Sequence, residues 1–510
     1  MVPWRIFGRI GHLGREHPVL APWVIEETET ANLNDERLNK RLRLILAQFS
    51  ERPMASIPTA CGGCAELNAA YRFFDNEKVE FKNILQPHVD STWLRIAAQP
   101  VVLMVNDTTE IDLTRPQQQV AGAGPLDGNS RRGALLHEMQ AFTPDGTPLG
   151  TVDALPWTRD DDKPTLTSQT RGERAATPIE EKESFRWLLS LRHARAEANR
   201  CPTTQIVYLA DSEADIYEVI AEGAEEPCTV DWIIRSCQDR ALVDDDEERF
   251  VLDYLRAELQ ASQVIYEHNI SIRGREAKVA CEERGRRQPR QSREAVVGVR
   301  AAPVTLRAPE KKAGQLPDVA VNAVLVSEKN PPEGDVAVEW LLLTSLPIAT
   351  SDQIKLVIEY YCSRWMIEIF FRILKSGCRV EKRRFETLER ELACLAVYMI
   401  VTWRTLLVCR LGQSCPEISC EAIFTPGEWR SVYRVVKRQE PPKTPPKLQE
   451  MVRLVAQLGG YVNKKNRKDE PGPQTVWLGL QRLHDIALCW ETFGPGAKEA
   501  KADDEREQDL

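Results

Sequence analysis

Residues 360–378 carry four polar side chains at spacings that a single helix would bring onto one face. Tyr361, Arg364, Glu368 and Lys375 lie at offsets of zero, three, seven and fourteen residues. At roughly 100° per residue, these offsets fall within about 60° of one another. Most of the remaining helix surface is apolar, which is typical of a buried helix. A single carboxylate on such a helix, flanked by cations, therefore calls for a functional explanation.

Two apolar runs upstream lead into aspartates. Residues 101–105 precede the segment that contains Asp107, and residues 206–210 lead directly into Asp211. Both runs predict buried strands that end on an aspartate. Together with Glu368, the two aspartates would supply three carboxylates from two strands and a helix. Such a set would suit hard divalent cations, which prefer oxygen ligands.

Simpler interpretations exist for each of these residues taken alone. An aspartate after a strand caps a loop more often than it binds a metal, and Asp112 or Asp215 could replace its neighbour as the ligand. Arg364 and Arg372 could merely pair with Glu368 across a helical turn, which is worth about 0.2 to 0.5 kcal/mol for each pair. From the residues alone, these simpler interpretations stay open.

The composition is that of an ordinary soluble protein. The chain has 510 residues, of which 42% are hydrophobic and 28% charged, and this length allows about two to four domains with substantial cores. The longest apolar run, residues 393–403, is too short to span a bilayer, and charged residues interrupt the N-terminal region. We therefore expect a cytoplasmic protein that has no membrane partner. The pair Cys61 and Cys64 has no second pair at zinc-site spacing, so we expect reduced thiols.

The distribution of charge matters more than the net charge of −9. Between Arg273 and Lys312 the chain has twelve Lys and Arg residues against five Asp and Glu residues, a local excess of +7. A second basic cluster covers residues 464–468, and residues 497–510 have the pattern of a disordered acidic tail. Basic charge is therefore concentrated in places where DNA could bind, although each cluster alone could also be a hydrated loop.

The N-terminal part of the chain has helical patterns. Residues 35–44 and 65–74 predict two helices, and we expect a helical N-terminal domain over residues 1–85. Basic residues lie beside an aromatic one there and could dock on a phosphate backbone, although a small helical core would have the same appearance. The residues in question are Arg41, Tyr71 and Arg72.

Strands and helices alternate in the middle of the chain. A hairpin signal at residues 144–148 and a helix near residues 180–197 indicate an α/β core over residues 86–415. Residues 228–345 are mostly β in pattern, and we interpret them as a domain inserted into that core. An apolar helix and a proline-rich linker then precede a helical C-terminal domain at residues 416–510.

These motifs together resemble those of the IS-four family of bacterial DDE transposases, and especially its Tn-five-like members. The Tyr-x2-Arg-x3-Glu-x6-Lys set at residues 361–375 is similar to the family signature. Residues 106–109 resemble the first-aspartate motif and residues 211–217 the second. The likeness runs over about residues 23–494. The acidic net charge, Glu110 after the first motif and the charged tail are departures from the family pattern.

The resemblance implies a ribonuclease-H-like α/β core interrupted by the inserted β domain. It also implies a helical DNA-binding domain at the N-terminus and a helical dimerisation domain at the C-terminus, to which this chain adds the acidic tail. Asp107, Asp211 and Glu368 would be the catalytic residues and would bind two Mg²⁺ or Mn²⁺ ions about 3.5 to 4 Å apart. Further residues that the resemblance places near DNA are Arg235, Trp340, Tyr361, Arg364 and Lys375.

The implied activity is cut-and-paste transposition of an insertion sequence by a homodimer. It comprises cleavage at the inverted repeats of the transposon ends, hairpin formation, and strand transfer into target DNA. Trp340 matches the family position whose ring stacks in hairpin formation, a contact worth about 1 to 3 kcal/mol. Two alternatives remain open, namely a ribonuclease-H-like nuclease that joins no DNA and an inactive copy that regulates by binding transposon ends.

Overall fold

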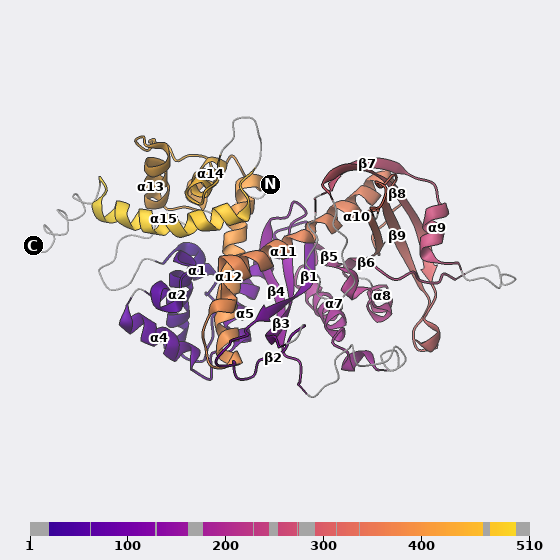
Figure 1. The fold of residues 1–510 in the computed structure, drawn as a ribbon, viewed down its shortest axis with the longest axis horizontal. Coiled ribbons are helices and arrows are strands. Elements are labelled where there is room, and N and C mark those ends of the chain that lie inside the picture. The colour runs from indigo at the N-terminus through magenta and orange to yellow at the C-terminus, as the bar shows by residue number, and fades with distance from the viewer. Residues whose placement is uncertain are drawn as a thin grey trace, which may run out of the picture.

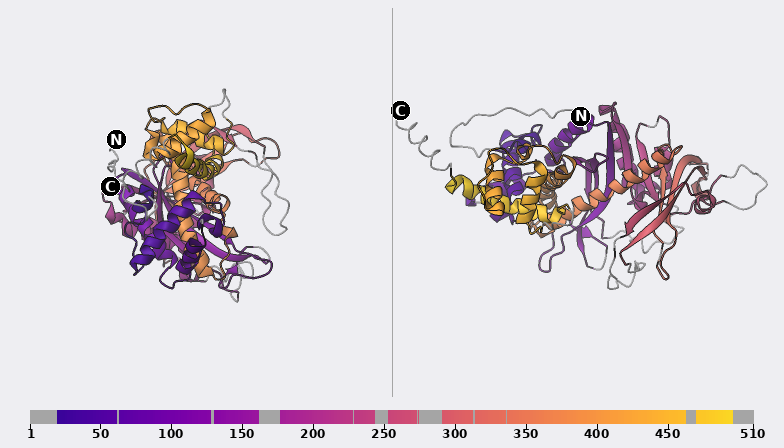
Figure 2. Two further views of the ribbon diagram at one scale, coloured as in Figure 1. Left: turned by 90° about the vertical axis from the view of Figure 1, so that its left-hand side faces the viewer. Right: turned by 90° about the horizontal axis from the view of Figure 1, so that it is seen from above.

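The computed structural model describes residues 20–61, 63–127, 130–161, 177–227, 229–243, 253–272, 274, 291–312, 314–335, 337–462 and 470–495. A mixed sheet runs through the middle of the molecule (Figure 1). The N-terminal and C-terminal helices lie together at one end, and strands β7–β10 form the other end (Figure 2). The predicted α/β class with helical ends is therefore confirmed.

The N-terminal helices confirm the two helices predicted at residues 35–44 and 65–74. Helix α2 begins where Asp35 accepts a 2.9 Å hydrogen bond from the backbone N–H of Arg37. Helix α5 runs through residue 85, and its buried polar residues, such as His88, obscure its apolar periodicity in the sequence. The domain boundary predicted at residue 85 stays a prediction. The helices here are α1 (Pro22–Glu26), α2 (Glu36–Glu51), α3 (Ile57–Cys61), α4 (Cys64–Phe74) and α5 (Phe81–Ala97).

The sheet has the strand order β2-β3-β1-β5-β6-β10-β9-β8-β7, and β4 also pairs with β3. Strands β1, β5 and β6 are parallel neighbours, and the other pairs are antiparallel. The strands are β1 (Val101–Asp112), β2 (Gly124–Pro125), β3 (Arg132–Phe142), β4 (Pro148–Trp157), β5 (Gln205–Ala210), β6 (Asp231–Ser236), β7 (Tyr266–Ile272), β8 (Arg293–Leu306), β9 (Val319–Glu328) and β10 (Glu339–Thr344).

Two of these strands bear directly on the predicted site. Strand β5 ends at Ala210, so Asp211 follows it as expected. Strand β1, in contrast, continues to Asp112, and Asp107 lies inside it rather than at its end. The correction arises because β1 pairs with β3 along its whole second half, from Asp107 onwards, and this pairing could not be seen in the apolar run alone.

The inserted segment is rich in strands, as predicted, but its strands are not a separate sheet. Strand β10 pairs with β6, and β9, β8 and β7 follow outward, so the insert extends the core sheet. Helix α9 (Leu255–Ala261) packs on β8 and β9. Residues 275–290, which hold six of the twelve Lys and Arg residues of the predicted basic cluster, lie outside the described residues.

Helices cover both faces of the sheet. Alternate residues of β1 divide between two cores, with Leu103 and Val105 in one and Val102 and Met104 in the other. The first core includes α11 (Trp365–Arg372) and α12 (Leu388–Ser414). The second includes α7 (Phe185–Glu197) and α8 (Tyr217–Gly223).

Helix α12 is the central helix of the fold. Of the helices in the described part of the chain, it is the one that is long and apolar enough to cross a membrane. However, 83% of its most apolar 18-residue stretch is buried inside the protein. Strand β4 and helices α5, α2 and α14 pack around it (Figure 1). The helix therefore has the surroundings of a core helix.

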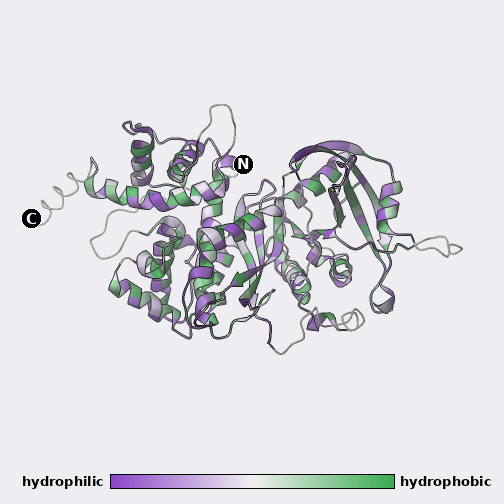
Figure 3. Cartoon of the chain, in the orientation of Figure 1, coloured by the Kyte–Doolittle hydropathy of each residue, from purple (hydrophilic) through white to green (hydrophobic). Residues whose placement is uncertain are grey.

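The C-terminal helices form a third core. They are α13 (Pro426–Lys437), α14 (Leu448–Leu458) and α15 (Pro473–Phe493), and they enclose Trp429 and Met451. Figure 3 shows that α15 and α4 each carry hydrophobic and hydrophilic residues, as helices do when one side packs and the other meets solvent. Helix α15 also contacts α2. The predicted basic cluster at 464–468 and the acidic tail at 497–510 lie outside the described residues.

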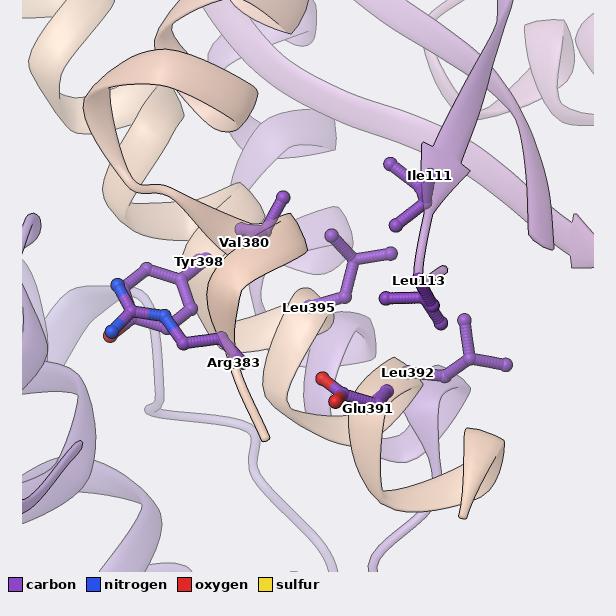
Figure 4. A pocket seen from close by; sticks show the side chains of 8 residues that line it. All are labelled: Ile111, Leu113, Val380, Arg383, Glu391, Leu392, Leu395 and Tyr398. Atoms are coloured by element: carbon purple, nitrogen blue, oxygen red, sulfur yellow. The ribbon is translucent and has the colours of Figure 1, made fainter. Parts of the chain in front are cut away.

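A small cavity lies between the end of β1 and α12 (Figure 4). Its two charged residues already have protein partners. Arg383 donates a 2.8 Å hydrogen bond to the carbonyl oxygen of Pro53, and Glu391 accepts one of 2.9 Å from the N–H of Phe385. The cavity therefore has the character of a packing defect between the end of β1 and α12. Its lining residues are Ile111, Leu113, Val380, Arg383, Glu391, Leu392, Leu395 and Tyr398.

Candidate active site

Strand register brings the two predicted aspartates to the same level of the sheet. Strands β1 and β5 are parallel, with Val105 opposite Leu209. Asp107 and Asp211 each lie two residues beyond that pair, Asp107 within β1 and Asp211 directly after β5. Asp107 is 8% exposed, whereas Asp211 is half-buried.

Helix α11 packs against β1 and brings Glu368 to the same region. Arg364 marks the junction between α10 (Ser351–Ser363) and α11. Its Nη1 atom lies 3.0 Å from Oδ2 of Asp107 and 3.9 Å from Oε1 of Glu368. The guanidinium therefore contacts Asp107 and approaches Glu368, with its side chain 13% exposed.

The electrostatics of Asp107 connect the three carboxylates. Burial, together with the negative charges of Asp211 and Glu368, raises the pKa of Asp107 to about 7 against the opposing effect of Arg364. Asp211 and Glu368 therefore both lie near enough to Asp107 for their charges to act on it. A carboxyl group perturbed by both burial and specific charged neighbours is a recognised sign of a functional site.

The donor set has the chemistry of a divalent-metal site, because all three side chains offer carboxylate oxygens. In the part of the chain that the structure describes, no three His, Cys, Asp or Glu side chains are gathered closely enough to hold one metal ion. Shared ligation by Asp107, Asp211 and Glu368 therefore remains a prediction. Cys61 and Cys64, which lie in the same described part, are free thiols.

The prediction that one helix brings Tyr361, Arg364, Glu368 and Lys375 onto a single face is wrong in its details. The helix is broken at Arg364, and Lys375 lies in a π-helical turn, Ile373–Gly377, which has more residues per turn than an α-helix. The Nζ atom of Lys375 is 3.9 Å from Oε1 of Glu381. The negative charges that act on it most strongly after Glu381 are those of Glu110 and Asp112. Lys375 therefore lies toward the far end of β1, where Glu110 and Asp112 are found.

The two alternative aspartates are both engaged elsewhere. Asp112 accepts a 2.9 Å hydrogen bond from Nε of Arg131. Asp215 is buried, pairs with Arg240, and accepts hydrogen bonds of 2.8 and 2.9 Å from the backbone N–H groups of Cys237 and Gln238. The carboxylate of Asp215 therefore fastens the loop after β6 to the loop after β5.

Three of the predicted DNA-contacting residues lie together on the Asp211 side of the site. The rings of Trp340 and Tyr361 are 6.4 Å apart. Burial raises the pKa of Tyr361, the charges of Arg364 and Arg235 lower it, and that of Asp211 raises it, so these charged groups are all near this phenol. Nη2 of Arg235 donates a 3.3 Å hydrogen bond to the carbonyl oxygen of Glu339. The structure thus brings Arg235, Trp340 and Tyr361 together.

The three N-terminal candidates lie on α2 and α4. Tyr71 contacts Phe385 edge to face at 6.0 Å and is half-buried. Arg41 and Tyr71 both lie near Cys61, and Arg72 is exposed. Tyr71 therefore contributes to packing, whereas Arg72 is the candidate that is open to solvent.

Two residues of this region were not predicted. Glu138 is fully buried on β3 directly opposite Asp107, and burial raises its pKa to about 8. Arg186, on α7, contacts Thr108, which follows Asp107, and Glu213, two residues after Asp211. No local sequence signal distinguishes them, because each matters only through pairing with residues far away in the chain.

Comparison with known proteins gives matches to transposase domains in the N-terminal, central and C-terminal parts of the chain. Three family models match: Transposase DNA-binding over residues 21–79, Transposase DDE domain over residues 185–403, and Transposase Tn5 dimerisation domain over residues 400–505. Among solved structures, the cryo-EM structure of the piggyBac transposase synaptic complex with hairpin DNA covers 83% of this chain and 82% of that chain. Its identity is 11% and its TM-score 0.30, which are too low to support an argument.

The fold and the three matched domains define a DNA transposase with a DDE catalytic domain. The three matches together support a Tn-five-like DDE transposase, similar to those of the IS-four family. It therefore acts on DNA, and it has a domain of the type through which such transposases dimerise. DDE domains of this kind generally use divalent metal ions.

Proposed function

We propose that this transposase excises an insertion sequence and joins it to target DNA, with Asp107, Asp211 and Glu368 as its catalytic carboxylates. One observation carries the proposal. The pKa of Asp107 is raised by burial and by the charges of Asp211 and Glu368, which come from separate parts of the chain. A structural aspartate on a core strand has no need of two further acids beside it.

The three carboxylates would hold Mg²⁺ or Mn²⁺, two ions in each site. When bound, such ions activate an attacking oxygen and stabilise a leaving oxygen in phosphodiester displacement. The protein's own side chains would position the DNA at the metal ions. Arg364 can offer a bidentate fork to a phosphate near Asp107, and the low exposure of Arg364 and Asp107 strengthens that interaction.

Hairpin formation at the transposon end is part of the proposal and rests on Trp340. Its ring is half-buried beside Tyr361, and Arg235 lies near the same phenol. A base turned out of the duplex could stack on the indole, which would contribute about 1 to 3 kcal/mol. The two cationic residues, Arg235 and Arg364, would neutralise the backbone on either side.

We further propose a role for each domain of the chain. Residues 1–85, with Arg41, Tyr71 and Arg72, would bind the inverted repeats of the transposon ends. Residues 86–415 would cut and join DNA, with the β insert at 228–345 and with Lys375 gripping phosphates near Glu110 and Asp112. Residues 416–510 would hold two copies together in the synaptic complex. The setting would be the cytoplasm, where the bacterial chromosome lies.

The test uses purified protein and a plasmid that carries the inverted repeats flanking the reading frame. We expect nicked ends, covalently closed hairpins and joined products in Mg²⁺ or Mn²⁺. Asp107→Asn, Asp211→Asn and Glu368→Gln should each abolish these products while retaining end binding. Asp352→Asn is the matched control, because Asp352 is 91% exposed and its partner is Lys355.

The outcomes separate the alternatives. Nicking without joined products would indicate a nuclease that does not transfer strands. Binding of end DNA without nicking in either metal would indicate an inactive regulator. Full cleavage by any of the three variants would overturn the assignment of the carboxylates.

A further inference from the structure

One guanidinium connects the two segments that hold the aspartates. Arg186, the second residue of α7, donates from Nε to Oγ1 of Thr108 at 2.9 Å. Its Nη2 atom donates to Oε2 of Glu213 at 2.7 Å. Thr108 follows Asp107 in the chain, and Glu213 lies two residues after Asp211. Arg186 therefore bridges β1 and the loop after β5.

Each end of this bridge continues to a carboxylate. The backbone N–H of Thr108 donates to Oδ1 of Asp107 at 2.7 Å. The backbone N–H of Glu213 donates to Oδ1 of Asp211 at 2.8 Å. Movement of either residue would therefore change the direction in which its aspartate points.

The guanidinium itself is held from several sides. Nη1 of Arg186 donates to the carbonyl oxygen of Glu183 at 2.8 Å, and the guanidinium lies 5.4 and 5.6 Å from the rings of Trp157 and Trp187. The side chain is 11% exposed. Its acceptor Oγ1 of Thr108 is in turn 2.9 Å from Nδ1 of the buried His137. A side chain fixed in this way is suited to holding other residues in place, not to reaching for DNA.

We propose that Arg186 is a positioning residue that sets the relative placement of Asp107 and Asp211. This inference rests on the proposed function of the two aspartates as metal ligands. Groups that hold metal ligands from behind typically change metal affinity or activity by about 10- to 100-fold when removed. Lysine would not substitute fully, because a single ammonium lacks the planar fork that reaches Thr108 and Glu213 together.

The experiment measures Mn²⁺ binding by the full-length protein and by its Arg186→Ala and Arg186→Lys variants. We expect Mn²⁺ affinity to fall about 10- to 100-fold in the alanine variant and less in the lysine variant. Affinity for end DNA in the absence of metal should stay at the wild-type value. Arg192→Ala is the matched control, because Arg192 lies on the same helix, is 47% exposed and pairs with Glu222 at 2.8 Å.

A second variant distinguishes loss of the Arg186 contact from a general loss of folding. Thr108→Val removes the hydroxyl acceptor but keeps the shape of the side chain, so it should weaken Mn²⁺ binding in the same direction with little loss of melting temperature. Wild-type Mn²⁺ affinity in both Arg186→Ala and Thr108→Val would overturn the inference. Asp107→Asn and Asp211→Asn are measured in parallel. If they also bind Mn²⁺ normally, the proposed function itself fails; if they lose Mn²⁺ and Arg186→Ala does not, only the positioning role fails.

Discussion

Arg364 and Asp107 form an ion pair in the middle of the site, with Nη1 of the guanidinium 3.0 Å from Oδ2 of the carboxylate. The pair joins the junction of α10 and α11 to strand β1, which are 257 residues apart in the chain. It accounts for how a buried aspartate with two acidic neighbours is tolerated. It also places a cation where a DNA phosphate would have to come close to the carboxylates.

The first prediction concerns this arginine. Arg364→Gln should reduce cleavage of transposon ends by about 10²- to 10³-fold, the usual cost of removing one preorganised charge stabiliser. Arg364→Lys should recover little, because lysine cannot bind a phosphate through two parallel hydrogen bonds. Cleavage of labelled end DNA measures both. Arg372→Gln is the control, since Arg372 is exposed on the same helix α11; equal losses in Arg364→Gln and this control would contradict the specific role of Arg364.

The second prediction concerns pH and Glu138. Burial raises the pKa of this carboxyl to about 8, and Oε2 has no hydrogen-bond partner among the described residues. The folded protein therefore keeps a proton that the unfolded chain loses above its ordinary pKa of 4.5. The stability that this proton provides is fully present below pH 4.5 and is lost as the pH rises through about 8.

Glu138→Gln removes that dependence. Relative to wild type, its free energy of unfolding should rise by roughly 1 kcal/mol per pH unit between those two pKa values and then level off. Urea unfolding of both proteins across this pH range gives the difference, in which the contributions of all other groups cancel. A difference that does not change with pH would show that Glu138 is ionised in the folded protein.

The third prediction concerns the attachment of the N-terminal helices. Glu27 is fully buried, pairs with His88, and accepts a 2.6 Å hydrogen bond from Nη1 of Arg95 on α5. Glu27→Ala should lower the free energy of unfolding by about 3 to 5 kcal/mol, because it leaves a charged partner without compensation. Denaturant unfolding measures the loss. The neighbouring exposed Glu29 provides the control, and a Glu29→Ala variant as unstable as Glu27→Ala would argue against the buried cluster.

The fourth prediction separates Asp215 from Asp211. Because Asp215 is saturated by Arg240 and by backbone N–H groups, Asp215→Asn should lose about 3 kcal/mol of stability. The fraction that remains folded should still cleave end DNA at low temperature. Asp211→Asn should show the opposite pattern, with near-normal stability and no cleavage. Loss of cleavage in a fully folded Asp215→Asn protein would restore Asp215 as a candidate ligand.

Local patterns predicted much of the fold. The helix at residues 65–74 became α4, the hairpin at 144–148 joins β3 to β4, and the strand before Asp211 ends where expected. Each depends on residues close together in the sequence, such as the turn at Gly146, whose φ of +82° favours glycine. Periodicity and turn chemistry are sufficient to locate elements of this kind.

Pairing across the sheet could not be predicted in the same way. The length of β1, the position of Glu138 opposite Asp107 and the continuation of the sheet into the insert all depend on register between distant strands. The break at Arg364 and the π-helical turn at Lys375 depend on tertiary packing of a segment that is regular in sequence. Arg186 is the clearest case, since its partners are 78 and 27 residues away.

The most direct test of the account replaces Asp107, Asp211 and Glu368 one at a time by cysteine and compares end cleavage in Mg²⁺ and Mn²⁺. A thiolate is a poor ligand for Mg²⁺ and a better one for Mn²⁺, so a direct metal ligand should be identifiable by rescue. Asp112→Cys serves as the control, because Asp112 pairs with Arg131. We predict that each of the three variants is inactive in Mg²⁺ and regains measurable cleavage in Mn²⁺. Full cleavage in Mg²⁺ by any one of them would contradict the assignment of that residue to the catalytic site.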